Sequence, residues 1–355
     1  MKITMLAHTI PPDGGISLGI ARYAYNLCCA LERAGNDVTM YVRKGTKKTE
    51  PWTKTIYAPK FSWIPYQIFS GCKMLGVESD VYHSDYVTTG AALRWSGRKP
   101  VVAAMHDAIP FTYDNTKLNI KQILAVRWFM KCFSSIKKAE AVVMASNDAK
   151  KEVIRLTDID PARVHAVHYG IDHSVFKPSR KNRGKKLKVG YLGGLDGRKN
   201  VGLLLDAFDL LQRNDVELHI AGYGSNLNIF RKRKISGAYF HGPISPEKAP
   251  EFYNSLDIFV MPSLQEGFGM MTLEAMSCGL PVIGVNRSST PEIIGNAGLL
   301  VEPDAHSLAK TIEKLLERDS IRERLAYSCL KRSRDFTWER CASDNMKIYS
   351  MLGKH

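Results

Sequence analysis

Short apolar segments alternate with longer helix-like segments along the first half of the chain. Apolar runs of this length, bounded by turn residues, are typical of buried strands. The expected strands are Lys2–Ala7, Asp37–Val42, Asp80–His83, Val101–Met105, Ala141–Ala145 and Val164–Val167, and a helix is expected over Ser17–Ala34. Strands that alternate with helices predict a parallel sheet covered by helices.

The same alternation begins again after a polar stretch. Residues 177–186 are charged and without periodicity, which indicates an interdomain linker. The strands expected after it are Leu187–Leu192, Glu217–Ala221, Ala238–Phe240, Asp257–Ser263 and Val282–Val285, with helices over 200–213, 270–278 and 305–333. The expected fold class is therefore α/β, with one domain over 1–176, a second over 187–336 and a final helix within 337–355.

Length and composition agree with two domains. The chain has 355 residues, of which 45% are hydrophobic, enough for two full cores. No run approaches the ~18 apolar residues of a membrane span, and Met1–His8 has the pattern of a strand rather than of a signal peptide. Seven cysteines form no Cys-x-x-Cys pair, so free thiols are expected. A cytoplasmic protein is the expectation.

The net charge of +15 requires an explanation. Nucleic acid, an anionic membrane surface and anionic substrates are the candidate partners. Residues 117–138 interleave apolar side chains with Lys and Arg, which predicts a basic amphipathic helix. Two interpretations are open: a core-facing helix of the first domain, or a helix that contacts a membrane peripherally. No nucleic-acid partner is expected, because no recognisable binding motif accompanies the charge.

The most informative segment runs from Glu266 to Glu274. It places a Gly-Phe-Gly loop, residues 267–269, between an expected strand and an expected helix. The glycines let the backbone pass a ligand closely, and the amides of residues 268–272 together with the helix dipole suit a diphosphate. The two carboxylates can each accept hydroxyl hydrogen bonds from a ribose or hexose diol. We interpret Glu266, Gly267, Phe268, Gly269, Met270, Met271, Thr272 and Glu274 as a nucleotide-sugar site.

Five further positions follow expected strands. Arg198 and Lys199 lie in a glycine-containing turn, where they could clamp a diphosphate or simply form a solvated basic turn. Gly222 begins a turn that lacks the third glycine of a dinucleotide fingerprint, and we count it among the donor-binding positions. Gly14 and Gly15 could bring backbone amides close to a sugar phosphate, or could form an ordinary strand-to-helix turn.

The sequence Asp158-Ile-Asp160 imitates a metal-binding signature. It lies in a polar turn before Pro161 rather than at a strand end, which indicates a helix start or a loop. Without a carboxylate cluster, neither a metal nor another cofactor is expected.

Six segments in this order resemble the retaining glycosyltransferases of family 4 (glycosyl transferases group 1), which include bacterial and archaeal mannosyltransferases and sucrose synthase. They are the Gly14-Gly15 loop, Met105–Pro110, His168–Asp172 with Phe176–Pro178, Gly193–Asn200, Glu266–Glu274 and Thr290–Ile294. The resemblance spans nearly the whole chain. It implies the GT-B fold: two Rossmann-like domains that face each other across a cleft, with a C-terminal helix that crosses back to the first domain.

The resemblance also assigns roles to single residues. His106 matches the histidine that hydrogen-bonds the donor hexose, and Lys199 matches the family's lysine. Arg198 can supply the charge of an arginine that the family often has where Gly194 stands here. His168 and Tyr169 depart from the family's usual Pro-Asn, and no catalytic role is drawn from them.

The expected function is transfer of a hexose with retention of configuration. The resemblance favours mannose from GDP-mannose over a UDP-hexose, and a glycan or lipid-linked acceptor in polysaccharide biosynthesis, at the cytoplasmic face of a membrane. Two other classes are open: a nucleotide-sugar epimerase of the same fold, and a non-catalytic basic protein that binds membranes or nucleic acid. The Glu266–Glu274 segment argues against both, because each leaves part of it without a use.

Overall fold

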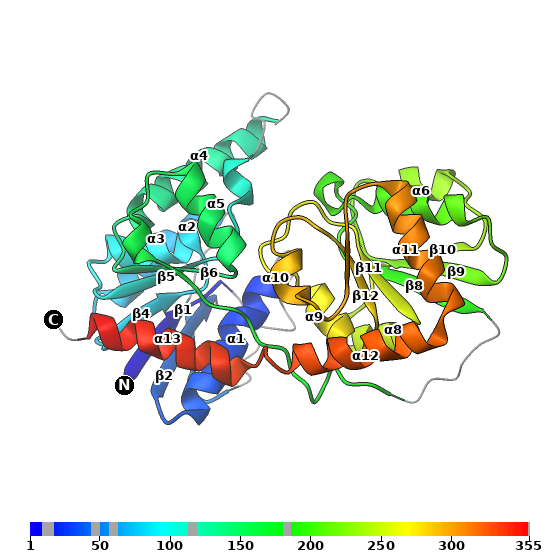
Figure 1. Ribbon diagram of the computed structural model, residues 1–355. Coiled ribbons are helices and arrows are strands. Elements are labelled where there is room, and N and C mark those ends of the chain that lie inside the picture. Colours follow the sequence, from blue (N-terminus) through cyan, green and yellow to red (C-terminus); the bar gives the residue numbers. More distant parts are fainter. Residues whose placement is uncertain (9–17, 44–49, 57–62, 113–118, 180–185, 354–355) are drawn as a thin grey trace. The chain divides into compact units, whose positions relative to one another are not determined.

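A computed structural model describes residues 1–8, 18–43, 50–56, 63–112, 119–179 and 186–353. The chain divides into two compact units (Figure 1). Residues 1–170 and 338–355 form the first unit, and residues 171–337 form the second. Each unit is an α/β domain of its own.

A parallel sheet of seven strands forms the centre of the first unit, in the order β3-β2-β1-β4-β5-β6-β7. The strands are β1 (Lys2–Leu6), β2 (Asp37–Arg43), β3 (Thr53–Ile56), β4 (Val81–Ser84), β5 (Val101–Met105), β6 (Ala141–Met144) and β7 (Val164–Ala166). The strands β4, β5 and β6 are buried at every position, as expected of a sheet with helices on both faces.

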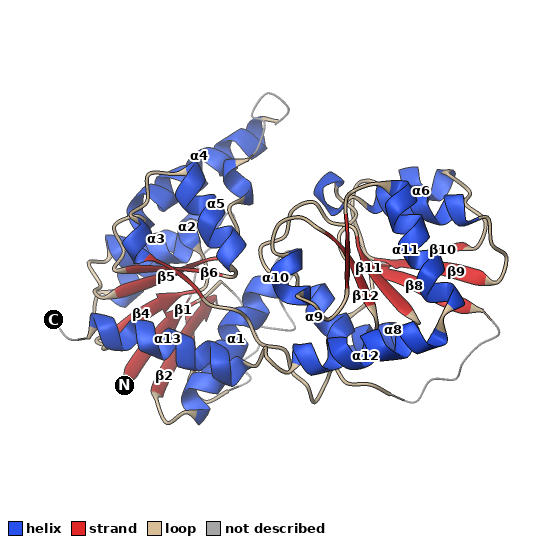
Figure 2. Cartoon of the chain, viewed as in Figure 1, coloured by secondary structure: helices blue, strands red, loops and turns tan. Residues whose placement is uncertain are grey.

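Helices cover the sheet of the first unit (Figure 2). They are α1 (Leu18–Arg33), α2 (Trp63–Met74), α3 (Val87–Trp95), α4 (Ile120–Ile136), α5 (Asn147–Leu156) and α13 (Trp338–Leu352). Helix α13 packs against α1. Its buried Tyr349 places a hydroxyl 2.6 Å from Nδ1 of His83, and the hydroxyl of Tyr23 on α1 lies 3.0 Å from Nε2 of the same ring. The last helix is thus bonded into the core of the first unit.

The second unit has a parallel sheet of six strands in the order β10-β9-β8-β11-β12-β13. The strands are β8 (Leu187–Leu192), β9 (Val216–Ala221), β10 (Ala238–Gly242), β11 (Ile258–Met261), β12 (Val282–Val285) and β13 (Leu299–Val301). The helices are α6 (Val201–Leu211), α7 (Leu227–Lys232), α8 (Ala249–Asn254), α9 (Met270–Ser277), α10 (Thr290–Ile294), α11 (Ala305–Glu317) and α12 (Asp319–Ser333).

All strands predicted from the pattern are present, within one or two residues of the expected bounds. The strands β3 and β13 were not predicted. Both lie at a sheet edge. Strand β3 is a polar Thr-Lys-Thr-Ile segment, and the apolar Leu-Leu-Val of β13 is shorter than the runs of about four or more residues that mark a strand in the sequence.

The boundary between the units lies before Ile171, earlier than the expected end of the first domain at 176. Phe176 is buried against Tyr253, with ring centroids 6.2 Å apart, and its carbonyl oxygen accepts a hydrogen bond of 2.7 Å from Ser277. Residues 171–176 therefore belong to the second unit. The expected linker, 177–186, lies largely outside the described residues.

Each sheet has one place where the strand order reverses direction. In the first sheet it lies between β1 and β4, and in the second between β8 and β11. Loops from the two strands leave in opposite directions there, which opens a crevice at the carboxyl ends where α/β proteins bind ligands. These two places are where functional side chains are expected.

Candidate active site

A buried ion pair lies at the reversal point of the second sheet. Lys199 follows β8 and Glu266 follows β11, and Nζ of Lys199 lies 2.5 Å from Oε1 of Glu266. The side chains are 5% and 8% exposed, so both charges are largely removed from water. An ammonium group has three N–H donors, of which this contact uses one. The pair can therefore present further donors to an anionic ligand.

Backbone hydrogen bonds hold the two loops together. The amide of Leu264 donates to the carbonyl of Arg198 at 2.9 Å, and Nη1 of Arg198 donates to the carbonyl of Gln265 at 3.2 Å. Arg198 thus bridges the turn after β8 to the loop after β11. The expected cationic residues and the first carboxylate are brought together.

Two serines that the sequence analysis did not identify fix the backbone of Glu266. Ser288 Oγ donates to its carbonyl at 2.8 Å and lies 3.2 Å from its amide, and Ser289 Oγ donates to the same carbonyl at 3.0 Å. Both precede α10. The sequence analysis recognised the Thr290–Ile294 motif. The two serines directly before this motif could have indicated that they belong to the site.

The second carboxylate lies on α9 and is 3% exposed. Oε2 of Glu274 accepts a hydrogen bond of 2.8 Å from the hydroxyl of Tyr253 on α8. This partner was also missed, because nothing near Tyr253 in the sequence marks it as part of the site. One oxygen of Glu274 is thus oriented by the protein.

The start of α9 has the geometry expected of an anion site. Gly269 adopts a left-handed conformation with φ 98°, and the amide of Leu273 makes the first intrahelical bond to its carbonyl. The preceding amides, of residues 270–272, point out of the helix end. Among the described residues, the buried hydroxyl of Thr272 has no hydrogen-bond partner. Phe268 is directed inward, with its ring 5.9 Å from that of Phe336.

Gly222 has a packing reason to be glycine. A Cβ at this position would lie 1.7 Å from the carbonyl oxygen of Gly193. The turns after β8 and β9 meet here, and the amide of Gly193 donates to Ala221 at 3.0 Å. Gly222 therefore lets the turn that leads to Lys199 take its position.

His106 lies in the first unit, after β5, and is 8% exposed. Its Nδ1 contacts the hydroxyl of Tyr169, and its Nε2 lies 2.6 Å from the carbonyl oxygen of Asp85. Burial lowers the pKa of His106, which keeps the ring neutral. The expected hydrogen bond to a donor hexose would have to replace one of these contacts. Gly14 and Gly15 lie outside the described residues.

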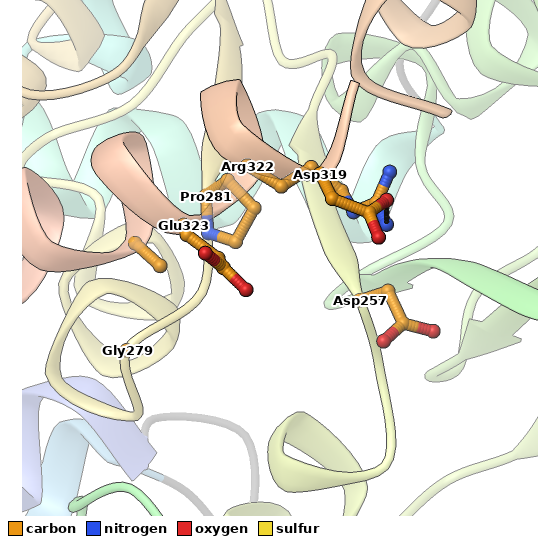
Figure 3. Close-up of a pocket in the computed structure, with 7 residues that line it drawn as sticks. Asp257, Gly279, Pro281, Asp319, Arg322 and Glu323 are labelled. Carbon is orange, nitrogen blue, oxygen red and sulfur yellow. Dashed lines mark hydrogen bonds and ion pairs between the residues drawn. The ribbon is translucent and has the colours of Figure 1, made fainter. Parts of the chain in front are cut away.

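Figure 3 shows a pocket of about 180 Å³ at the other edge of the second sheet. Asp257 and Pro281, which line it, precede β11 and β12, so the pocket lies at the amino ends of the strands. Its arginine, Arg322, pairs with Asp319 and donates to the carbonyl of Leu316 at 3.1 Å. These bonds of Arg322 link the start of α12 to the end of α11. The pocket lies at the opposite ends of the strands from the Lys199–Glu266 site.

The metal-like acidic pair has structural partners. Asp158 forms an ion pair of 2.7 Å with Lys137, and Asp160 caps the turn at Pro161–Arg163 by accepting from the amide of Ala162. The described residues hold no cluster of three or more His, Cys, Asp or Glu suited to a metal. None of the described helices is long and apolar enough to cross a membrane.

Comparison with known families identifies the class of protein. Residues 18–175 match the sequence profile described as Glycosyltransferase Family 4, and residues 186–318 match the one described as Glycosyl transferases group 1. The chain belongs to this family, and it is a glycosyltransferase.

Individual relatives agree with this assignment. The chain is 35% identical to the O-antigen chain mannosyltransferase B of Escherichia coli over 46% of its own length, a match that covers 45% of that protein. It is 25% identical to a D-inositol 3-phosphate glycosyltransferase of a Nocardioides species over 98% of its own length and 89% of the relative's. The chain therefore matches less than half of the first relative and most of the second.

A solved structure gives the same fold. The sucrose-phosphate synthase of Thermosynechococcus elongatus superimposes with a TM-score of 0.80 over 99% of both chains, at 21% identity. The two parallel-sheet units are those of a GT-B glycosyltransferase, which confirms the expected fold.

Proposed function

We propose that this glycosyltransferase transfers a hexose, with mannose favoured, from a nucleoside diphosphate sugar to a glycan or lipid-linked acceptor. The donor occupies the second unit, with Glu274 on the ribose hydroxyls and Glu266 with the Gly267–Gly269 backbone on the hexose. Lys199, Arg198 and the amides of residues 270–272 hold the diphosphate.

The observation that carries this proposal is the position of the Lys199–Glu266 pair. It lies at the reversal point of the second sheet, between the turns that also carry Arg198 and the free end of α9. An ammonium, a guanidinium and helix amides that follow two neighbouring strands suit a diphosphate, and the carboxylates suit sugar hydroxyls. These cationic groups would stabilise the departing diphosphate, so the proposal includes no metal.

In the proposed reaction, the bond between the anomeric carbon and the diphosphate oxygen breaks while the acceptor oxygen bonds to the same face of that carbon. The acceptor proton passes to the departing phosphate oxygen. Lys199 and Arg198 stabilise the negative charge that develops on the diphosphate. Retention of configuration follows from this route, and the product's anomeric signal in NMR tests it; an inverted product would refute it.

The relative named a mannosyltransferase favours GDP-mannose, and a UDP-hexose is the second candidate. We expect one nucleotide sugar from a panel of GDP-mannose, UDP-glucose, UDP-GlcNAc and UDP-galactose to raise the melting temperature. The Glu274→Ala variant should lose this shift and the transfer activity, because it lacks the carboxylate that would bind the ribose.

Tyr253→Phe is the matched control for this prediction. It removes the hydroxyl bonded to Glu274 but keeps the carboxylate, so a reduced donor shift is expected rather than none. If this protein converts the donor to its epimer in the absence of an acceptor, it is an epimerase and not a transferase. Absence of a shift with every donor would refute the site.

A lipid surface is the second partner we propose, through helix α4. The buried residues of this helix, Phe129, Cys132, Phe133 and Ile136, all belong to its second half. Ile120 and Leu124 in the first half are 69% and 56% exposed. Packing into the core therefore accounts for the apolar residues in the second half of α4 but not for those in the first half.

Charge supports the same partner. Lys121, Arg127 and Lys131 are exposed on α4, and Trp128 packs against Trp95 of α3 with ring centroids 5.7 Å apart. The first half of the helix extends away from the sheet (Figure 1). Exposed apolar residues beside cations and tryptophans suit an anionic membrane interface.

We expect the Ile120→Ser/Leu124→Ser variant to lose most binding to vesicles of phosphatidylglycerol and phosphatidylcholine, measured by flotation. Binding of the unchanged protein should weaken with salt, because exposed charges are screened. The control is Leu210→Ser/Ile229→Ser, which changes two exposed residues of the second unit, 46% and 61% exposed. Equal binding of both variants would show that α4 does not contact the membrane.

A further inference from the structure

The reversal point of the first sheet carries a polar cluster that the proposed donor site does not use. His8 follows β1, and Asp85 follows β4, so the two residues flank this point as Lys199 and Glu266 flank it in the second sheet. The carboxyl ends of β1 and β4 lie next to each other because the two strands pair in parallel, with Leu6 opposite Ser84.

Asp85 is fully buried and holds His8 in place. Its Oδ2 accepts a hydrogen bond of 2.8 Å from the amide of His8, its Oδ1 lies 3.1 Å from Nδ1 of the His8 ring, and the hydroxyl of Thr89 donates to it at 2.7 Å. Burial raises the pKa of Asp85, but the interactions with His8 and the bond from Thr89 outweigh it, so the pKa lies below its usual value. The carboxylate is ionised and its bonds orient the imidazole.

The other ring nitrogen of His8 faces Thr88. Nε2 lies 2.9 Å from the hydroxyl oxygen of Thr88, which is in the first turn of α3. In the neutral tautomer that donates Nδ1–H to Asp85, Nε2 accepts from the Thr88 hydroxyl. The His8 side chain is 28% exposed, whereas Asp85 beneath it is closed to solvent. His8 is thus the more exposed member of the cluster, with its Nε2 beside the hydroxyl of Thr88, which is 7% exposed.

Nε2 of His8 and the hydroxyl of Thr88 can together bind one alcohol group. A hydroxyl group that inserts between them can donate its proton to Nε2 of His8 and accept a hydrogen bond from Thr88. His106, by contrast, is 8% exposed, and its ring nitrogens contact the Tyr169 hydroxyl and the Asp85 carbonyl oxygen. Among the histidines that end β1 and β5, His8 is the one with an exposed edge.

We propose that His8 and Thr88 bind a hydroxyl group of the acceptor sugar, with Asp85 as the positioning residue that fixes the imidazole. The inference rests on the proposed function, because it assumes that the donor binds to the second unit. It assigns the acceptor to a particular pair of side chains, and it gives the buried carboxylate a use. A carboxylate buried at this edge is costly unless fully bonded, and its bonds go to His8 and Thr89.

The test uses the full chain, the donor that stabilises it, and p-nitrophenyl α-mannoside as acceptor. In His8→Ala and Thr88→Val the KM for this acceptor should rise about 10- to 100-fold, as expected for loss of one or two hydrogen bonds. The donor-induced shift in melting temperature and the slow hydrolysis of donor without acceptor should stay unchanged. Asp85→Asn should raise the same KM, because the imidazole is no longer held by a charged partner.

Two controls keep the outcome clear. His306→Ala makes the same change at an exposed position on α11 of the second unit and should leave all readouts unchanged. His8→Gln replaces His8→Ala if the alanine variant does not fold. An acceptor KM within about twofold of the original protein in both His8→Gln and Thr88→Val would overturn the proposal, as would loss of the donor shift in these variants. If the proposed function itself is wrong, the result is different, because the unchanged protein would then show neither a donor-induced shift in melting temperature nor donor hydrolysis.

Discussion

The Lys199→Met variant is expected to lose transfer activity by at least about 100-fold and to be about 3–5 kcal/mol less stable. Activity falls because the ammonium proposed to bind the departing diphosphate is gone. Stability falls because Glu266, 8% exposed and 2.5 Å from the ammonium, is left as an uncompensated buried charge. Glu266→Gln should destabilise for the same reason, with the buried ammonium left over.

The double variant Lys199→Met/Glu266→Gln separates the two effects. Replacing both members of a buried ion pair with uncharged groups of similar shape costs little. The double variant should therefore recover most of the free energy of unfolding in urea while remaining inactive. If it is as unstable as the sum of the single variants, the two residues are not energetically coupled and the ion pair does not explain their burial.

Gly222→Ala is expected to destabilise the second unit by about 3 kcal/mol or more. The added Cβ would lie 1.7 Å from the carbonyl oxygen of Gly193, a backbone atom that cannot rotate away. The backbone of this residue has φ 144°, a conformation that residues other than glycine rarely adopt. Urea denaturation measures the loss, and the folded fraction should show a weakened donor shift because the turn that carries Lys199 is displaced.

Gly202→Ala provides the matched control. Gly202 lies in α6, where an added Cβ would meet nothing within 4 Å. Alanine in a helix is favoured over glycine, so a gain of about 0.5–1 kcal/mol is expected. Equal stability of Gly222→Ala and Gly202→Ala would mean that the turns after β8 and β9 do not meet as closely as described.

The proposed chemistry depends on loops that are distant in the sequence. Lys199 and Glu266 lie 67 residues apart, and Ser288 and Ser289 hold the backbone of Glu266 from a third loop. His8 and Asp85 are separated by 77 residues. In both units a parallel sheet brings these positions together, because each follows the carboxyl end of a strand near the reversal point.

The sequence by itself determined the α/β class, the central strands and the glycosyltransferase family. These follow from local signals: short apolar runs between turn residues, and motifs such as Glu266–Glu274 whose residues are consecutive. It also located Lys199, Glu266 and Glu274, because glycines and strand ends beside them mark them in the sequence. The edge strands β3 and β13 were not predicted because β3 is polar and β13 is only three residues long.

Only the tertiary structure decided which side chains are partners. Tyr253 bonds Glu274 from another helix, and residues 171–176 belong to the second unit rather than the first. His106 is enclosed, whereas His8, which the pattern presented only as the end of a strand, carries an oriented imidazole. The physical reason is that hydrogen bonds and burial depend on distances through space, which a one-dimensional pattern fixes within an element but not between elements.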